Sequence, residues 1–137
     1  MELIISQEHG RVPVTILSVR GEMDPLSANE IALRAREIFA TGARYLLINL
    51  TDVPALGWAG LLAIDSILEF LLANRSSDEW RAMDQEIRSE TLKSPQLKLV
   101  NPSTLALREL RRSGTDLYLD IYPTLKEAIA SFGPTPR

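Results

Sequence analysis

The apolar positions between residues 44 and 75 form the clearest pattern in the chain. Residues 45–50 are a short, nearly uninterrupted apolar run followed by turn residues, which is typical of a strand buried on both faces. After a turn at residues 51–57, apolar residues recur every three or four positions, at Leu61, Ile64, Leu68 and Leu71. This period is that of a helix facing a sheet. The pattern therefore predicts a central strand, a loop and a helix.

The loop between this strand and this helix is the first candidate functional site. The N-terminus of a helix leaves unpaired backbone N–H groups and carries the positive end of the helix dipole. Phosphate groups and carboxylates bind favourably at such a terminus. We therefore expect the activity of the chain to centre on the loop Asp52–Gly60 and the start of the helix, which would meet a phosphate or a partner's carboxylate.

The residues before the central strand predict two strands and a helix. The runs at residues 3–6 and 12–19 are rich in β-branched residues and are separated by a turn, which indicates an antiparallel pair. Residues 21–25 end the second strand. Ser27, with Glu30 three positions later, predicts a capping box at the start of a helix that ends at Gly42. Its apolar face comprises Ala28, Ile31, Ala32, Ala35, Ile38 and Phe39.

Residues 76–93 predict an additional amphipathic helix that is inserted before the fourth strand. Ser77 could cap it, and its apolar residues fall on one side. The preceding helix carries more apolar residues than one contact with a sheet can bury, at Leu62, Ile67, Phe70 and Leu72. We expect the inserted helix to cover this surplus, or the two helices to form a homodimer surface that includes Leu62, Phe70, Trp80, Met83 and Ile87.

The rest of the chain predicts two more strands and two more helices. Residues 97–100 form a short apolar strand, and Ser103 and Gly114 mark the two ends of a helix. Residues 117–122 alternate as a strand, and Thr124 with Glu127 marks the start of the last helix. Strands separated by helices predict an α/β fold with a mixed, mostly parallel sheet. We expect one domain at residues 1–133, with an insertion at 76–93 and a tail at 134–137.

The composition excludes several classes of function. The chain has 137 residues and no cysteine, and His9 is its single histidine, which excludes disulfides, a cysteine nucleophile and multi-histidine zinc sites. A net charge of −3 without clustered Lys and Arg argues against nucleic acid binding. The longest apolar run is too short to span a bilayer, and residues 1–10 do not read as a secretion signal. We expect a cytoplasmic protein without a metal or another cofactor.

Five segments in order carry a resemblance to a known family. They are Val14–Val19 leading into Gly21-Glu22-Met23-Asp24, Leu46–Leu50 leading into Asp52-Val53-Pro54, Gly60-Leu61, Val100-Asn101-Pro102-Ser103, and Ile121-Tyr122-Pro123-Thr124 followed by Glu127-Ala128. With these segments the chain resembles the STAS domain of bacterial anti-sigma factor antagonists. The resemblance covers the chain except residues 76–93. It implies a STAS-like fold and a partner that is a kinase-like anti-sigma factor or another signalling protein.

The family's phosphorylation loop is altered in this chain. In the family this loop reads Asp-Ser-Ser-Gly or Asp-Ser-Thr-Gly, and the anti-sigma factor phosphorylates a serine there. The matching residues here are Gly57, Trp58, Ala59 and Gly60, so the acidic residue and the acceptor hydroxyl are both missing. The nearest hydroxyl, on Thr51, matches no family acceptor. We therefore predict no phosphorylation site.

The resemblance also implies a partner-binding surface. Its candidate residues are Asp24, Asp52, Gly57, Trp58, Ala59 and Gly60. Trp58 has two interpretations: its indole fills the core, as aromatic side chains usually do, or it is exposed and binds the partner. Asp24 is either a turn or capping residue or part of the same surface.

Two functions from different classes remain open. The first is a non-catalytic protein-interaction module, an antagonist-like or scaffold protein, because the chain offers neither a Ser-His-Asp set nor a P-loop. The alternative is a sensor of a nucleotide or lipid, or an accessory subunit in lipid transport. A ligand between Leu62, Phe70 and Trp80 would explain the surplus apolar surface, as would dimerisation or ordinary packing.

Overall fold

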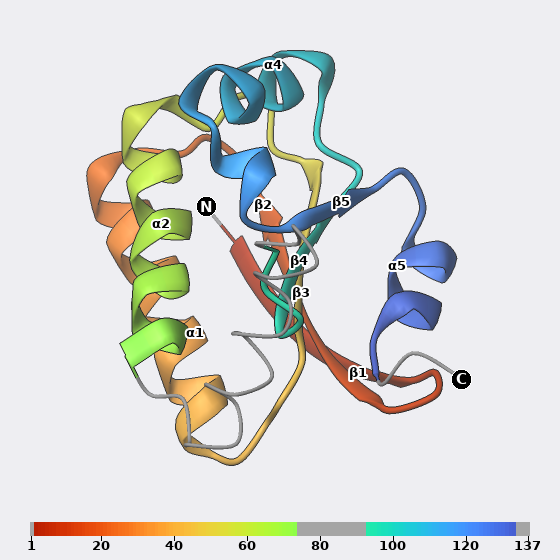
Figure 1. Ribbon diagram of the computed structural model, residues 1–137. Helices are drawn as coiled ribbons and strands as arrows, with labels where there is room; N and C mark the ends of the chain where they lie inside the picture. Colours follow the sequence, from red (N-terminus) through yellow and green to blue (C-terminus); the bar gives the residue numbers. More distant parts are fainter. Residues whose placement is uncertain (1, 74–92, 134–137) are drawn as a thin grey trace.

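The computed structural model describes residues 2–73 and 93–133, and its strands form one sheet in the order β1-β2-β3-β4-β5 (Figure 1). The β1–β2 pair is antiparallel, and the β2–β3, β3–β4 and β4–β5 pairs are parallel. The strands are β1 (Glu2–His9), β2 (Pro13–Arg20), β3 (Leu46–Asp52), β4 (Leu97–Val100) and β5 (Asp120–Tyr122). This arrangement confirms the predicted α/β fold with a mixed, mostly parallel sheet.

Helices cover both faces of the sheet. Figure 1 shows α1 and α2 side by side on one face and α5 on the other, while α4 lies beyond the ends of the strands. The helices are α1 (Pro25–Ala40), α2 (Gly57–Ala73), α4 (Thr104–Ser113) and α5 (Leu125–Ser131), and a short 3-10 turn, η1, spans Thr115–Leu117. The predicted inserted helix, with Trp80, Met83 and Ile87, and the predicted tail lie outside the described residues.

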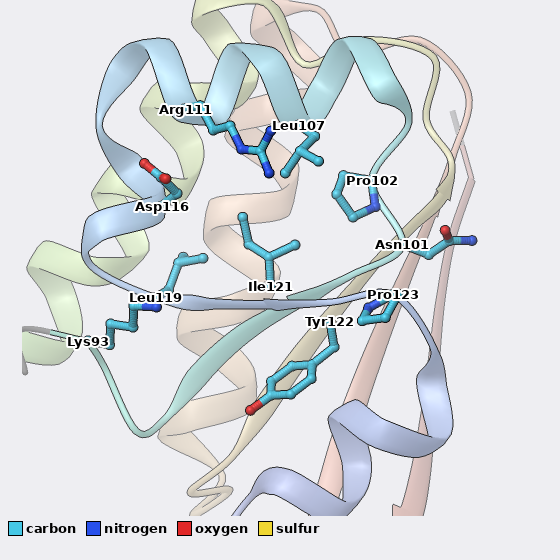
Figure 2. Close-up of a pocket in the computed structure, with 10 residues that line it drawn as sticks. All are labelled: Lys93, Asn101, Pro102, Leu107, Arg111, Asp116, Leu119, Ile121, Tyr122 and Pro123. Carbon is cyan, nitrogen blue, oxygen red and sulfur yellow. The ribbon is translucent and has the colours of Figure 1, made fainter.

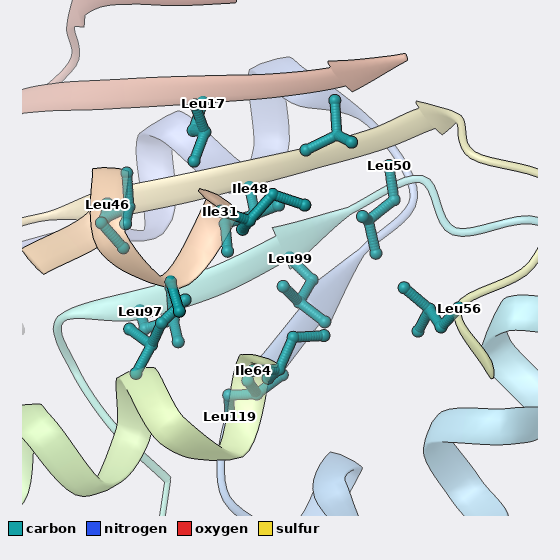
Figure 3. Packing of buried hydrophobic residues seen from close by; sticks show 14 of the residues in the cluster. Leu17, Ile31, Leu46, Ile48, Leu50, Leu56, Ile64, Leu97, Leu99 and Leu119 are labelled. Atoms are coloured by element: carbon teal, nitrogen blue, oxygen red, sulfur yellow. The ribbon is translucent and has the colours of Figure 1, made fainter. Parts of the chain in front are cut away.

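The central strand β3 is buried on both of its faces. Leu46, Ile48 and Leu50 pack into the cluster formed with α1 and α2 (Figure 3). Leu47 packs on the opposite face with Ala128 of α5. Successive side chains of a strand point to opposite faces, so an almost continuous apolar run is what two covered faces require. The sequence-based prediction of a central strand is therefore confirmed.

The start of α1 differs from the prediction. The helix begins at Pro25 and is capped by Asp24, whose carboxylate accepts a hydrogen bond from the Ser27 N–H at 2.8 Å. The Ser27 hydroxyl accepts in turn from the Asp24 N–H at 2.9 Å. The predicted box between Ser27 and Glu30 is wrong, because Pro25 is preorganised for the first helical position and starts the helix earlier. The other predicted caps, Ser103, Gly114 and Thr124, are confirmed.

The last strand is shorter than the predicted 117–122. Gly114 adopts a left-handed conformation (φ 80°) and leads into η1, which the Tyr118 N–H closes by donating to the Thr115 carbonyl at 3.0 Å. Leu117 is consequently 61% exposed, and pairing with β4 begins only at Asp120. The alternation of Leu117, Leu119 and Ile121 suggested a strand, but it does not show whether the backbone is extended, and here the first of these residues belongs to the turn.

A buried lysine joins β4 to α5. Lys98 is 6% exposed, and its Nζ donates to the carbonyl and the hydroxyl of Ser131 at 3.1 and 3.0 Å. The same Nζ lies 4.7 Å from the centre of the Phe132 ring and 5.6 Å from that of Tyr122. Burial lowers the pKa of Lys98, and the charge of Asp120 opposes this shift in part.

The lowered pKa of Lys98 predicts a specific pH dependence of stability. The unfolded chain binds this proton more tightly than the folded chain, so the free energy of unfolding should rise with pH up to the ordinary value of 10.5. We expect wild type to gain stability relative to Lys98→Met between neutral pH and about pH 10. Urea unfolding of both proteins across this range measures the gain. Lys126→Met, on the exposed side of α5, is the control; a difference for Lys98→Met that is independent of pH would contradict the prediction.

Candidate functional site

The predicted partner-binding residues meet at the carboxyl ends of the central strands. Asp52 ends β3, and its carbonyl accepts from the Gly21 N–H at 3.1 Å, which places the loop before α1 beside the loop after β3. The carboxylate of Asp52 also lies 3.6 Å from Nε of Arg20. Asp24 caps α1 on the same side, and Gly57 begins α2. The structure therefore brings together two loops that are far apart in the sequence.

Asp24 has the capping role that the sequence offered as one interpretation. Hydrogen bonds from the Ser27 backbone N–H and from the Ser27 hydroxyl hold the pKa of its carboxyl below the ordinary value. The carboxylate is nevertheless exposed to solvent. Asp24 is thus a structural cap that still presents negative charge at this end of the molecule.

Trp58 is exposed. Its side chain is 69% accessible, so the interpretation that its indole fills the core is wrong. Leu62, one turn later on α2, is 55% exposed. Between α1 and α2 lies a groove of about 290 Å³ that Trp58 and Leu62 border and that small residues, including Ala28, Ala59 and Ala63, line. An exposed tryptophan beside an apolar groove is the arrangement that protein interfaces favour.

Gly60 lies in a closely packed position. A Cβ atom at this position would lie 3.0 Å from Cβ of Leu56 and 3.0 Å from Cγ of Met23. Glycine therefore lets the first turn of α2 approach the loop that precedes α1 without displacing these side chains. Gly57 differs, because it has a positive φ of 64° and, among the described residues, nothing lies within 4 Å of the place its Cβ would take.

Glu109 of α4 occupies the amides at the start of α2. Its Oε1 accepts from the Leu56 N–H at 3.0 Å, and its Oε2 accepts from the Gly57 N–H at 2.6 Å. These are the groups at which the sequence predicts a phosphate or a partner's carboxylate, and here a carboxylate of the same chain binds them. Sequence analysis missed Glu109. The available signal was that α2 has a leucine at its cap position and no acidic residue in its first turn.

A second cleft, of about 430 Å³, lies between α4 and β5 (Figure 2). Leu107, Leu119 and Ile121 form its apolar lining, and Figure 2 shows the guanidinium of Arg111 directed into the space above Ile121. Among the described residues, no carboxylate forms an ion pair with Arg111. Lys93, at the rim, pairs with Asp120 at 3.1 Å.

The predicted ligand site on α2 is a different place. Leu62 is exposed at the groove described above, and Phe70 is partly buried against the core with the Arg36 guanidinium 5.8 Å from its ring centre. Trp80 lies outside the described residues. Within residues 2–73 and 93–133, no three His, Asp or Glu side chains gather as metal ligands, and no helix is long and apolar enough to cross a membrane.

Comparison with known proteins gives a family and a set of similar structures. The family model of the STAS domain matches residues 4–76. The crystal structure of an anti-sigma factor antagonist from Mycobacterium paratuberculosis is similar with a TM-score of 0.70 and 21% identity, over 95% of this chain and 92% of the other. That of a putative anti-sigma factor antagonist from Thermotoga maritima gives 0.57 and 23%, over 85% and 84%. Among curated proteins, no sequence matches this chain significantly. At these identities the structural similarity shows a common fold.

The exposure of Trp58 predicts that truncating it leaves the fold intact. Trp58→Ala should change the free energy of unfolding by no more than about 0.5 kcal/mol, because little of the indole is buried. Leu56→Ala, two positions earlier and 1% exposed, should cost about 2–5 kcal/mol. Urea unfolding of wild type and of both variants measures the three free energies of unfolding. A loss above about 2 kcal/mol in Trp58→Ala would mean that the indole packs against the protein.

Proposed function

The chain belongs to the STAS domain family, and from this membership we propose that it is a non-catalytic protein-interaction module of bacterial signalling. In this proposal it acts in the cytoplasm as an antagonist-like or scaffold protein. Two structural neighbours described as anti-sigma factor antagonists support this kind of role. The observation that carries the proposal is the exposure of Trp58 at the start of α2, beside an apolar groove.

The docking surface in this proposal is formed by the exposed residues Asp24, Asp52, Gly57 and Trp58, and the buried Ala59 and Gly60 support it from below. Trp58 supplies a large apolar contact at a low cost in conformational entropy, since its side chain has only two rotatable bonds. The exposed carboxylate of Asp24 adds negative charge here and would orient a partner that carries basic groups, whereas the charge of Asp52 is partly balanced by Arg20. The partner that fits the family is a kinase-like anti-sigma factor or another signalling protein.

We further propose that this docking is independent of phosphate. A phosphate group adds nearly two negative charges and can release a docked partner. The positions that match the family's acceptor loop hold Trp58 and Ala59, which have no hydroxyl group. Binding would therefore be controlled by the amount or the conformational state of the partner rather than by modification of the loop.

Partner binding should depend on Trp58. We expect an affinity pull-down from the native cell extract, read by mass spectrometry, to retain a signalling protein with wild type and to lose it with Trp58→Ala. With the purified partner, calorimetry should then show a dissociation constant raised at least about 30-fold, the loss typical of a central interface tryptophan.

The control for this experiment is Leu125→Ala. Leu125 is 39% exposed on α5, which covers the opposite face of the sheet, so its truncation should leave binding unchanged. Equal binding by wild type and a folded Trp58→Ala would rule out docking through Trp58. An equal loss of partner binding in Trp58→Ala and Leu125→Ala would indicate a non-specific effect on the fold.

The cleft between α4 and β5 favours small-ligand sensing as a second candidate function. Arg111 without a described ionic partner, above an apolar floor, suits a small anion with an apolar body, such as a nucleotide or a fatty acid. A ligand that binds only the folded state raises the unfolding temperature. We expect such a shift in a panel of these compounds to vanish in Arg111→Ala and to persist in Arg108→Ala, which does not line the cleft. If none of these compounds shifts the unfolding temperature at saturating concentration, they are excluded as ligands of the folded protein.

A further inference from the structure

We infer that Glu109 is a positioning residue that sets the affinity of the docking surface by holding the loop before α2 in its binding conformation. The inference rests on the proposed docking function and extends it to a residue that lies on another element. The loop is residues 53–57, and Glu109 reaches it from α4, more than fifty positions further along the chain.

The amides that Glu109 binds lack a partner in their own segment. An ordinary helix start is capped by the side chain of Ser, Thr, Asp or Asn, but Leu56 precedes Gly57 at the start of α2. The Leu56 side chain is 1% exposed, so the turn is anchored in the core and its N–H cannot turn freely to solvent. The hydrogen bond at the Leu56 N–H is partly buried, so losing its acceptor is costly, whereas the Gly57 N–H is exposed and can bind water when Glu109 is absent.

The contact is made through both carboxylate oxygens, one to each amide, at 3.0 and 2.6 Å. Hydrogen bonds to a charged acceptor are stronger than neutral ones, and the two-point contact fixes direction as well as distance. The same helix makes a second contact, because the hydroxyl of its cap residue Ser103 donates to the Pro54 carbonyl at 2.8 Å. α4 therefore contacts the loop near its start, at Pro54, and at its end, at Leu56 and Gly57.

Gly57 makes this restraint decisive for Trp58. Gly57 has a positive φ, and glycine adopts many backbone conformations. Among the described residues, apart from its neighbours in the chain, nothing packs within 4 Å of the position that a Cβ atom would take. The backbone of Trp58 follows directly from this residue. Without the hydrogen bond to Glu109, the first turn of α2 could fray and the indole would sample many positions. Binding would then have to pay for ordering it.

The first arm of the test needs no partner. Compared with wild type, Glu109→Ala should exchange the amide hydrogens of Leu56 and Gly57 faster. This acceleration should be at least about tenfold larger than the acceleration at core amides of β3. Glu109→Gln should show a smaller increase, because its amide group keeps one acceptor oxygen. Sodium acetate should slow the exchange again in Glu109→Ala, since its carboxylate can enter the vacated position, while sodium chloride at equal ionic strength should not. Glu127→Gln, exposed on α5, is the control.

The second arm uses the purified partner identified by the Trp58-dependent pull-down. Its dissociation constant should rise about tenfold for Glu109→Ala and recover in part with acetate but not with chloride. Binding is measured where urea unfolding shows that Glu109→Ala is fully folded, so that the recovery reports the loop and not the folded fraction. If Trp58→Ala binds the partner weakly and Glu109→Ala binds it like wild type, the inference fails and the proposed function stands. If Trp58→Ala itself binds like wild type, the proposed function fails and the inference with it. Unchanged exchange at Leu56 and Gly57 in Glu109→Ala also overturns the inference.

Discussion

Burial of β3 on both faces is the constraint on which the rest of this structure depends. A strand with Leu46, Leu47, Ile48 and Leu50 almost fully covered needs a neighbour on each side and a layer of helices above and below. The parallel neighbours β2 and β4 satisfy the first requirement, and α1, α2 and α5 satisfy the second. The carboxyl ends of parallel strands lie at the same end of the sheet, so the segments that follow β2, β3 and β4 meet there. The proposed docking surface and the helix that contacts its loop are both assembled from these segments.

Local patterns were enough to predict most of the elements. The apolar run of β3, the three-and-four spacing of α2 and the caps at Ser103 and Thr124 are properties of neighbouring residues, and all of them are found in the structure. The two errors were also local. Pro25 moved the start of α1 to Asp24, and the turn after Gly114 replaced the first half of the predicted last strand. In both cases a backbone preference outweighed a side-chain pattern.

The candidate site was only partly predictable, because its contacts join distant segments. The sequence identified the loop before α2 as the site, yet it left the position of the Trp58 indole open and gave no reason to select Glu109. Burial explains which of the four family positions is retained. Gly60 is packed closely against Leu56 and Met23, where a larger residue would displace its neighbours, whereas Trp58 is exposed and its identity is not restricted by the core. Packing thus favours the glycine, while it does not explain the choice of Trp58.

The strand pairings also differ in how far along the chain their partners lie, and this has a consequence for the order of folding. The β1–β2 hairpin joins adjacent segments through a short turn, so closing it costs little chain entropy. The β3–β4 pairing, in contrast, brings Leu46 to Leu97 across α2 and the whole segment that follows it. Contacts of such long sequence separation slow folding, because the loop must close before the contact is gained. We expect the closing of this pair to limit the folding rate. The hairpin would form early as a template, and the edge of the sheet that carries α4, and with it Glu109, would be the last part to reach its native position.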